Sequence, residues 1–244
     1  MTKLFIGGAE EAVDALKIRE AGLPYVHLSA KRLIHNVKNF EKSLYGPRLQ
    51  HIQNFPTDFE EVLLEFDKPY DILDLLQDYV DIFAYHYSNQ DYFESIDIDK
   101  RCPILTKWES KYSDYSYIGI WSHAPETVKK TIIANARKYK IKVFGGAAPN
   151  MDDIREYGYD IINSSRWLSS RTFGNKAVFV IDRFHYISNK KDDHGLIRAA
   201  CIKHGIDYGV VKEVRAGNKS GEIIAEIEKL TLGAFREWMA SLQK

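Results

Sequence analysis

Short apolar runs alternate with helical stretches along most of this 244-residue chain. The apolar runs have the length and composition of strands, and several of them end in glycine or in a polar residue. We expect strands at residues 4–6, 25–28, 80–85, 117–121, 141–144, 159–162 and 177–181, and helices at 10–21, 58–65, 70–79, 126–139, 152–157, 195–204 and 222–242. Alternation of this kind predicts an α/β protein with a parallel sheet covered by helices.

The number of alternating units predicts that this sheet closes on itself. Six or seven strands with a similar number of helices fit a (β/α)₈ TIM-type barrel, full or slightly trimmed. Such a barrel needs about 250 residues. No linker, low-complexity run or break in composition divides the chain, so we expect residues 1–244 to form a single domain. A doubly wound open sheet is the alternative.

The composition excludes several classes of protein. With 45% hydrophobic and 28% charged residues, the chain is neither disordered nor a disulfide scaffold. Since no apolar run is long enough to cross a bilayer, we expect no membrane association. Cys102 and Cys201 are expected to be reduced thiols in a cytoplasmic protein. The formal net charge of zero argues against a protein that mainly wraps nucleic acid, but it allows a local basic patch.

Candidate site residues follow the predicted strands, because the active site of a barrel gathers at the carboxyl ends of its strands. Gly145 and Gly146 would let a ligand approach the backbone closely, and a tight turn is the alternative explanation. Ser122 and His123 follow the strand at 117–121, where an acid–base role suits a histidine, although an ordinary surface histidine is more common. Tyr87 lies in an aromatic stretch that suits base stacking or, more simply, core packing.

Metal binding is not expected, because the eight histidines form no metal-binding spacing and the two cysteines lie far apart in the sequence. We likewise expect no cofactor, since the glycine spacings of a P-loop and of a dinucleotide-binding turn are both missing.

A polar, cationic and aromatic segment follows the strand predicted at 159–162. It begins at Asn163, contains Arg166, Trp167 and Arg171, and ends near Lys176. Side chains of these kinds contact phosphates and bases in nucleic-acid complexes. The arginines and the lysine are therefore candidates for nucleic-acid binding, and the tryptophan is a candidate for a substrate contact. The start of a capped helix explains the same residues without a function.

Several features between residues 143 and 174 occur together in a fixed order. A glycine-rich strand end with a proline at 145–149 is followed by a short helix at 152, a strand after Gly158, a Ser-Ser-x-Trp-Leu sequence at 164–168, and Gly174. This series resembles the tRNA-guanine transglycosylase superfamily, above all its phage and bacterial DNA-targeting branch. Those enzymes are (β/α)₈ barrels that exchange guanine for a 7-deazaguanine in a polynucleotide. The resemblance implies the same fold and substrate class here.

Three positions depart from the pattern of that superfamily. The nucleophilic aspartate that the resemblance implies falls on Asn163, the acid–base aspartate falls on His51, and the base-recognising aspartate falls on Tyr87. An amide cannot form the covalent glycosyl intermediate that a carboxylate forms. The resemblance therefore implies a pocket with Asn163, His51 and His123 in catalytic positions, in which the family's chemistry is altered or lost.

The sequence thus predicts a cytoplasmic nucleic-acid base-modification protein that resembles guanine or 7-deazaguanine transglycosylases and acts on DNA or tRNA. One alternative is a non-catalytic, nucleic-acid-binding subunit that pairs with an active paralogue or with a second copy of itself. A second alternative is an unrelated barrel enzyme that acts on a small phosphorylated metabolite.

Overall fold

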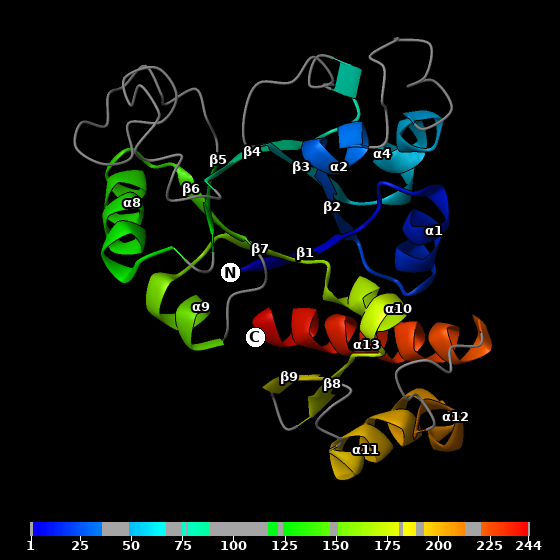
Figure 1. Cartoon of the computed structure of the whole chain (residues 1–244). Helices are drawn as coiled ribbons and strands as arrows, with labels where there is room; N and C mark the ends of the chain where they lie inside the picture. The colour runs from blue at the N-terminus through cyan, green and yellow to red at the C-terminus, as the bar shows by residue number, and fades with distance from the viewer. Residues whose placement is uncertain are drawn as a thin grey trace. The chain divides into compact units, whose positions relative to one another are not determined.

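The computed structural model describes residues 2–35, 49–66, 75–76, 78–87, 117–121, 124–146, 151–180, 183–188, 193–212 and 221–243. The chain divides into two compact units (Figure 1). Unit 1 comprises residues 1–19 and 24–164, and unit 2 comprises residues 20–23 and 165–244. That the two units behave as a single domain, as expected from the sequence, stays a prediction.

Unit 1 is built on a closed ring of parallel strands (Figure 1). Each strand pairs with the next one along the chain, and the last pairs with the first, with Asn163 beside Phe5. The seven strands are β1 (Lys3–Gly7), β2 (Tyr25–Ser29), β3 (Glu61–Phe66), β4 (Ile82–Tyr87), β5 (Tyr117–Trp121), β6 (Lys142–Gly146) and β7 (Ile161–Ser164). The pairing of β7 with β1 also excludes the open sheet.

The prediction of an eight-stranded (β/α)₈ barrel is wrong, because the described strands of the ring number seven. The strand expected at 177–181 is β8 (Lys176–Val180), and it pairs with β9 (Arg183–Ile187) in a separate antiparallel sheet. Two residues connect β8 to β9 in the sequence. A connection this short suits a hairpin, whereas a parallel neighbour needs a crossover of about a dozen residues or more.

The prediction of a helix at 58–65 is also wrong. Strand β3 occupies most of this range, after a 3₁₀ turn, η2 (Ile52–Asn54), and a short helix, α4 (Phe55–Asp58). Its residues Val62, Leu63 and Leu64 are all buried. A strand that is covered on both faces has consecutive apolar residues, and a buried helix shows the same pattern. Most of the helix expected at 70–79 lies outside the described residues.

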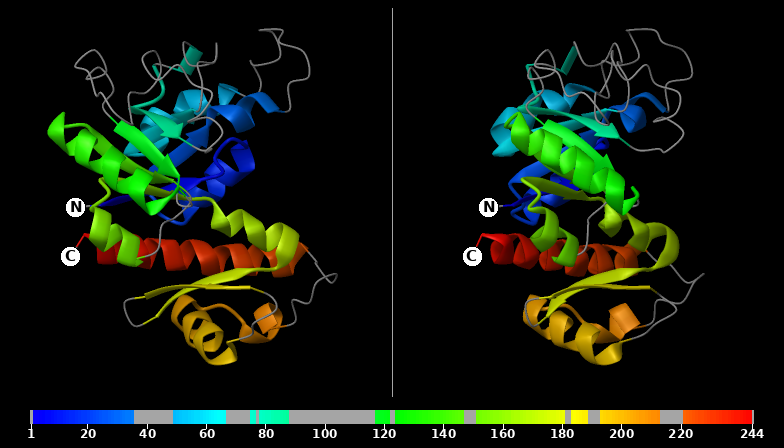
Figure 2. Two further views of the ribbon diagram at one scale, coloured as in Figure 1. Left: turned by 60° about the vertical axis from the view of Figure 1, so that its left-hand side comes forward. Right: turned by 90° about the vertical axis from the view of Figure 1, so that its left-hand side faces the viewer.

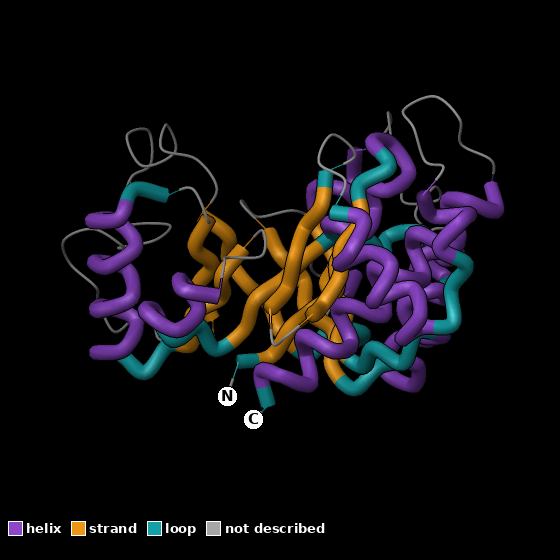
Figure 3. Tube along the Cα trace, turned by 90° about the horizontal axis from the view of Figure 1, so that it is seen from below, coloured by secondary structure: helices purple, strands orange, loops and turns teal. Residues whose placement is uncertain are grey.

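The described helices of unit 1 lie outside the ring (Figure 3). Besides α4, they are α1 (Ala12–Glu20), α2 (Ala30–His35), α8 (Glu126–Lys138) and α9 (Met151–Tyr157), which follow β1, β2, β5 and β6. Asp160 fixes the turn between α9 and β7, because its Oδ2 accepts hydrogen bonds from Arg137 Nη1 at 2.9 Å and from the Val143 amide at 2.7 Å. This turn sets the start of the strand that carries Asn163.

The interior of the ring is mainly apolar. Five buried side chains from five strands, with Tyr25 of β2 packed against them, form one cluster: Phe5, Leu63, Ile82, Phe144 and Ile161. Side chains alternate between the two faces of a strand, so residues two positions further along the same strands also point inward. This alternation directs His27, Glu65 and Asn163 into the ring.

Unit 2 packs the β8–β9 hairpin against two helices, α11 (His194–His204) and α13 (Gly221–Leu242), which match the helices expected at 195–204 and 222–242 (Figure 2). On one face of the hairpin, the ring of Phe184 stacks on Trp238 at 4.5 Å and on Phe235 at 5.1 Å between centroids. On the other face, Val178 and Ile187 join a core with residues of α11. The remaining elements are η4 (Arg166–Leu168), α10 (Ser169–Phe173) and α12 (Tyr208–Lys212).

None of the helices in the described part of the chain is long and apolar enough to cross a membrane. Cys201 is a buried free thiol, and burial raises its pKa above the ordinary value. Cys102 lies outside the described residues.

Candidate functional site

Three polar side chains meet inside the ring of unit 1. His27 comes from the middle of β2, while Glu65 and Asn163 each stand one residue before the end of β3 and β7. Asn163 is 6% exposed, and the side chains of His27 and Glu65 are 7% and 19% exposed. They lie toward the carboxyl ends of the strands, which is the face where barrel proteins place their chemistry. We call these three residues the interior cluster.

The interior cluster is connected by hydrogen bonds. Nε2 of His27 lies 3.0 Å from Oε2 of Glu65. The Nδ2 amide of Asn163 donates to the same carboxylate oxygen at 3.3 Å, and it lies 3.2 Å from His27 Nε2. One carboxylate oxygen is thus shared by an imidazole and an amide.

An apolar ring lies beside this polar group. The rings of His27 and Phe144 lie 6.0 Å apart between centroids, and Phe144 belongs to the apolar lining of the barrel. Charges and hydrogen bonds act more strongly where water is largely excluded. A carboxylate beside an imidazole in such a place is suited to proton transfer, or to stabilising a positive charge that develops on a bound molecule.

The glycines that end β6 lie close to this cluster along the sheet. Gly145 pairs with Ile162, so Gly146 and Asn163 occupy the next positions on the two neighbouring strands. Both glycines are buried. A side chain at position 146 would take up space beside the Asn163 amide.

The other candidate residues of unit 1 lie away from the interior cluster or outside the described residues. Nε2 of His51 lies 3.1 Å from the carbonyl oxygen of Ala9, and its ring packs edge-on against Phe55. These contacts join the turn after β1 to the segment before β3, and Glu65 rather than His51 is the residue that meets Asn163. Ser122 and His123 lie outside the described residues, as does the side chain of Tyr87, whose backbone ends β4.

The candidates for nucleic-acid binding in unit 2 have three different environments. Arg166 is exposed, and its guanidinium carbon lies 5.1 Å from the centre of the Tyr186 ring. Arg171 forms an ion pair with the buried carboxylate of Glu228 and lies over the Trp167 ring, which is itself buried. Lys176 is also buried. Of the three cations, Arg166 is therefore the one most accessible to a large partner.

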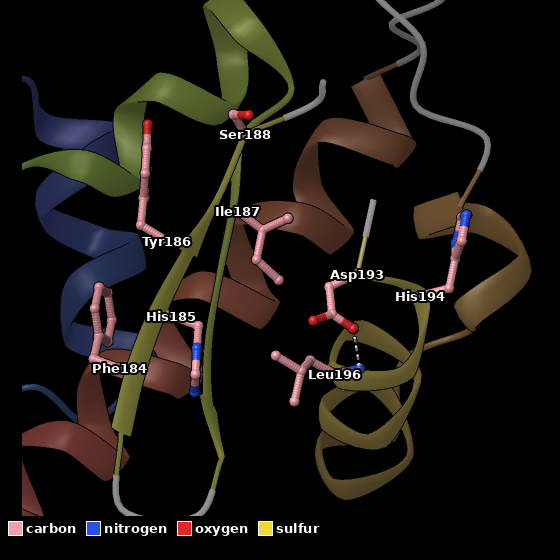
Figure 4. Close-up of a pocket in the computed structure, with 8 residues that line it drawn as sticks. All are labelled: Phe184, His185, Tyr186, Ile187, Ser188, Asp193, His194 and Leu196. Atoms are coloured by element: carbon pink, nitrogen blue, oxygen red, sulfur yellow. Dashed lines mark hydrogen bonds between the residues drawn. The ribbon is translucent and has the colours of Figure 1, made fainter. Parts of the chain in front are cut away.

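Unit 2 also has an open cavity of about 900 Å³ between β9 and the start of α11 (Figure 4). Asp193 caps α11, because its Oδ1 accepts a hydrogen bond from the Leu196 amide at 3.2 Å. Nδ1 of His194 lies 2.8 Å from the hydroxyl of Tyr208. Two polar side chains of the cavity, Asp193 and His194, are thus engaged in hydrogen bonds within unit 2. The lining residues are Phe184, His185, Tyr186, Ile187, Ser188, Asp193, His194 and Leu196.

Sequence reasoning missed two of the three members of the interior cluster. Glu65 was assigned to a helix, and His27 was taken as one residue of a strand without a role. The available signal was a single polar residue within a short apolar strand, as in Tyr25-Val26-His27-Leu28. Such a residue must either face solvent or find a partner inside.

The part of the chain that the structure describes contains no group of three or more histidine, cysteine, aspartate or glutamate side chains that could hold a metal ion. Comparison with known proteins gave no relative: no family model matches the chain, and no curated protein or solved structure matches it significantly.

Proposed function

We propose that this chain acts on the glycosidic bond of a nucleic-acid base, in DNA or tRNA, and that Glu65 supplies the carboxylate of the reaction. The observation that carries the proposal is the position of this carboxylate, within hydrogen-bond distance of Asn163 inside the barrel. The resemblance to the transglycosylases requires a carboxylate at the site, and positions 163 and 51 carry an asparagine and a histidine. Strand β3 brings a carboxylate to the same place.

The reaction that fits these residues is a base exchange. The bond between the sugar carbon C1′ and the base nitrogen breaks, and its electron pair leaves with the base. A carboxylate oxygen of Glu65 bonds to C1′, and the nitrogen of an incoming base later displaces it. The outgoing base takes up one proton and the incoming base gives one up, and His27 is placed to carry it. Asn163 orients the carboxylate through its amide.

The interior cluster also fits the non-catalytic alternative in one respect. Asn163 stands where the resemblance implies a nucleophile, and an amide can only bind and orient. In that case the barrel would hold a base without exchanging it.

The proposal includes a cytoplasmic location, which the free thiol of Cys201 supports.

The test is incorporation of labelled guanine into a single-stranded DNA oligonucleotide and into a tRNA transcript by the purified full chain. We expect exchange by the unmodified protein, and a loss of at least about a thousandfold with Glu65→Gln, since this variant keeps the shape but loses the charge. Glu60→Gln is the matched control, because Glu60 is an exposed carboxylate just before β3. It should leave the rate unchanged.

Two results would count against the proposal. Equal rates of exchange by Glu65→Gln and by the unmodified protein would show that Glu65 takes no part in the reaction. Binding of the oligonucleotide with no exchange by any form would favour the non-catalytic alternative.

A further inference from the structure

An exposed arginine and an exposed tyrosine lie together on the surface of unit 2. The guanidinium of Arg166, from η4, lies over the ring of Tyr186, from β9, with 5.1 Å between the guanidinium carbon and the ring centre. Tyr186 is 37% exposed. A guanidinium that lies over a ring can be approached on the side opposite to that ring.

The tyrosine ring is fixed in place by its hydroxyl group. The Tyr186 hydroxyl accepts a hydrogen bond from Asn175 Nδ2 at 2.7 Å and lies 2.7 Å from Ser169 Oγ. Figure 4 shows Tyr186 on the opposite side of β9 from Ile187, so it points away from the side of the strand that Ile187 occupies. Three segments of unit 2 thus hold one aromatic ring, and little side-chain entropy remains to be lost when a partner binds.

A second exposed aromatic side chain lies on the same side of α10. Phe173 is 59% exposed and stands four residues after Ser169, which is about one helical turn. Because Ser169 reaches Tyr186, Phe173 lies one turn further along that face. We call Arg166, Phe173 and Tyr186 the stacking surface.

The charge of this part of the chain favours an anionic partner. Residues 161–193 contain six arginines and lysines and three acidic residues, Asp182, Asp192 and Asp193. Within the described residues, Glu228 balances Arg171 and Lys176 is buried, whereas Arg166 and Arg183 are exposed. Exposed cations next to exposed aromatic rings are the combination with which proteins bind unpaired nucleotides.

We propose that the stacking surface binds single-stranded nucleic acid. A base stacks on the guanidinium of Arg166 or on the ring of Phe173, and Arg166 holds a neighbouring phosphate. A duplex fits less well, because its bases are already stacked and paired. The inference rests on the proposed function only in that the partner is a nucleic acid. Unit 2 need not carry out any reaction to bind this nucleic acid.

The experiment is fluorescence anisotropy with labelled 12-nucleotide single strands of DNA and of RNA and with a DNA duplex, using the full chain. We expect Arg166→Ala and Phe173→Ala each to weaken single-strand binding by about 10-fold, the effect of losing one stacking contact. Tyr186→Phe keeps the ring but loses the hydroxyl that holds it, so it should weaken binding by less than Arg166→Ala does. Arg198→Ala is the matched control, since Arg198 is exposed on α11. It should change the dissociation constant less than twofold.

Equal losses for Arg166→Ala and Arg198→Ala would overturn the proposal, because they would show attraction by charge alone. Duplex binding as tight as single-strand binding, or no binding of either single strand, would overturn it as well. Comparison of the DNA strand with the RNA strand shows whether the surface prefers deoxyribose or ribose. Binding is measured on Arg166→Ala and Phe173→Ala, whereas exchange is measured on Glu65→Gln, so failure of the exchange reaction and failure of this surface are distinguishable.

Discussion

At the scale of single residues, the ion pair between Arg171 and Glu228 offers a clear test of the unit 2 core. Glu228 is 1% exposed, and Arg171 supplies the guanidinium that balances its charge. We expect Arg171→Met to destabilise the protein by about 2 to 3 kcal/mol, because it removes the guanidinium that pairs with a buried carboxylate. The effect stays below that of a fully buried pair, since the arginine is partly exposed. Urea denaturation measures it.

The control for this variant is the double change Arg171→Met with Glu228→Gln. Removing the charge together with its partner should restore part of the lost stability. A double variant as unstable as the single one would mean that the packing of Arg171 on Trp167, rather than its charge, is what counts.

His204 gives a pH dependence whose sign follows from its environment. Its Nε2 lies 3.2 Å from Oε1 of Glu237, and burial lowers its pKa below the ordinary value, although Glu237 acts in the opposite direction. The folded protein therefore takes up this proton less readily than the unfolded chain does. Stability from this residue is complete above about pH 6.5, the ordinary value, and is lost as the pH falls below it.

The measurement is the Tm at pH 7.5 and at pH 5.5. We expect the Tm to fall less between these two values in His204→Asn than in the unmodified protein. An equal or larger fall in the variant would show that His204 is not held in its neutral form.

The sequence predicted the environment of a single residue correctly where the position of that residue along a strand determines its environment. Asn163 was expected at a strand end and lies in the interior cluster. Its partners Glu65 and His27 were not found, because they are 98 and 136 residues away in the sequence. Contacts across a closed ring depend on strand register, and no local pattern of a single sequence contains that information.

At the scale of secondary-structure elements, helix α13 depends on a glycine in its interior. A Cβ atom at Gly233 would lie 2.8 Å from Cε1 and 2.9 Å from Nδ1 of His204. The imidazole would have to leave its position beside Glu237. We therefore expect Gly233→Ala to destabilise the protein by about 1 to 2 kcal/mol, although alanine is normally favoured in a helix.

Two comparisons check this prediction by thermal denaturation. Gly221→Ala, at the start of the same helix, has no atom within 4 Å of the new Cβ and should be neutral or stabilising. In a His204→Ala background, Gly233→Ala should become stabilising because the obstacle is gone. The same loss in both backgrounds would refute the steric explanation.

Elements were predictable where hydrophobic spacing was distinctive. The strands at 25–28 and 117–121 and the closing helix at 222–242 were found close to β2, β5 and α13. The failure at β3 has a physical cause, because consecutive buried residues suit a strand covered on both faces as well as a buried helix segment.

At the scale of the whole molecule, the sequence predicted a closed parallel barrel with one strand too many. Strand–helix alternation is a property of the chain up to Ser164, where unit 1 ends. Beyond it, the close spacing of β8 and β9 makes a hairpin, and unit 2 forms its own core with α11 and α13. In the sequence, only the short connection between β8 and β9 indicated that β8 belongs to a hairpin and is not an eighth strand of the barrel.

In the proposed reaction, Glu65 forms a bond to the sugar carbon when a base leaves. Intact-mass spectrometry of the full chain, incubated with a single-stranded oligonucleotide in the absence of an incoming base, tests it most directly. We expect a covalent protein–oligonucleotide adduct whose linkage maps by peptide sequencing to Glu65, and we expect Glu65→Gln to abolish it. An adduct on any other residue, an adduct that persists in Glu65→Gln, or no adduct at all would contradict the claim.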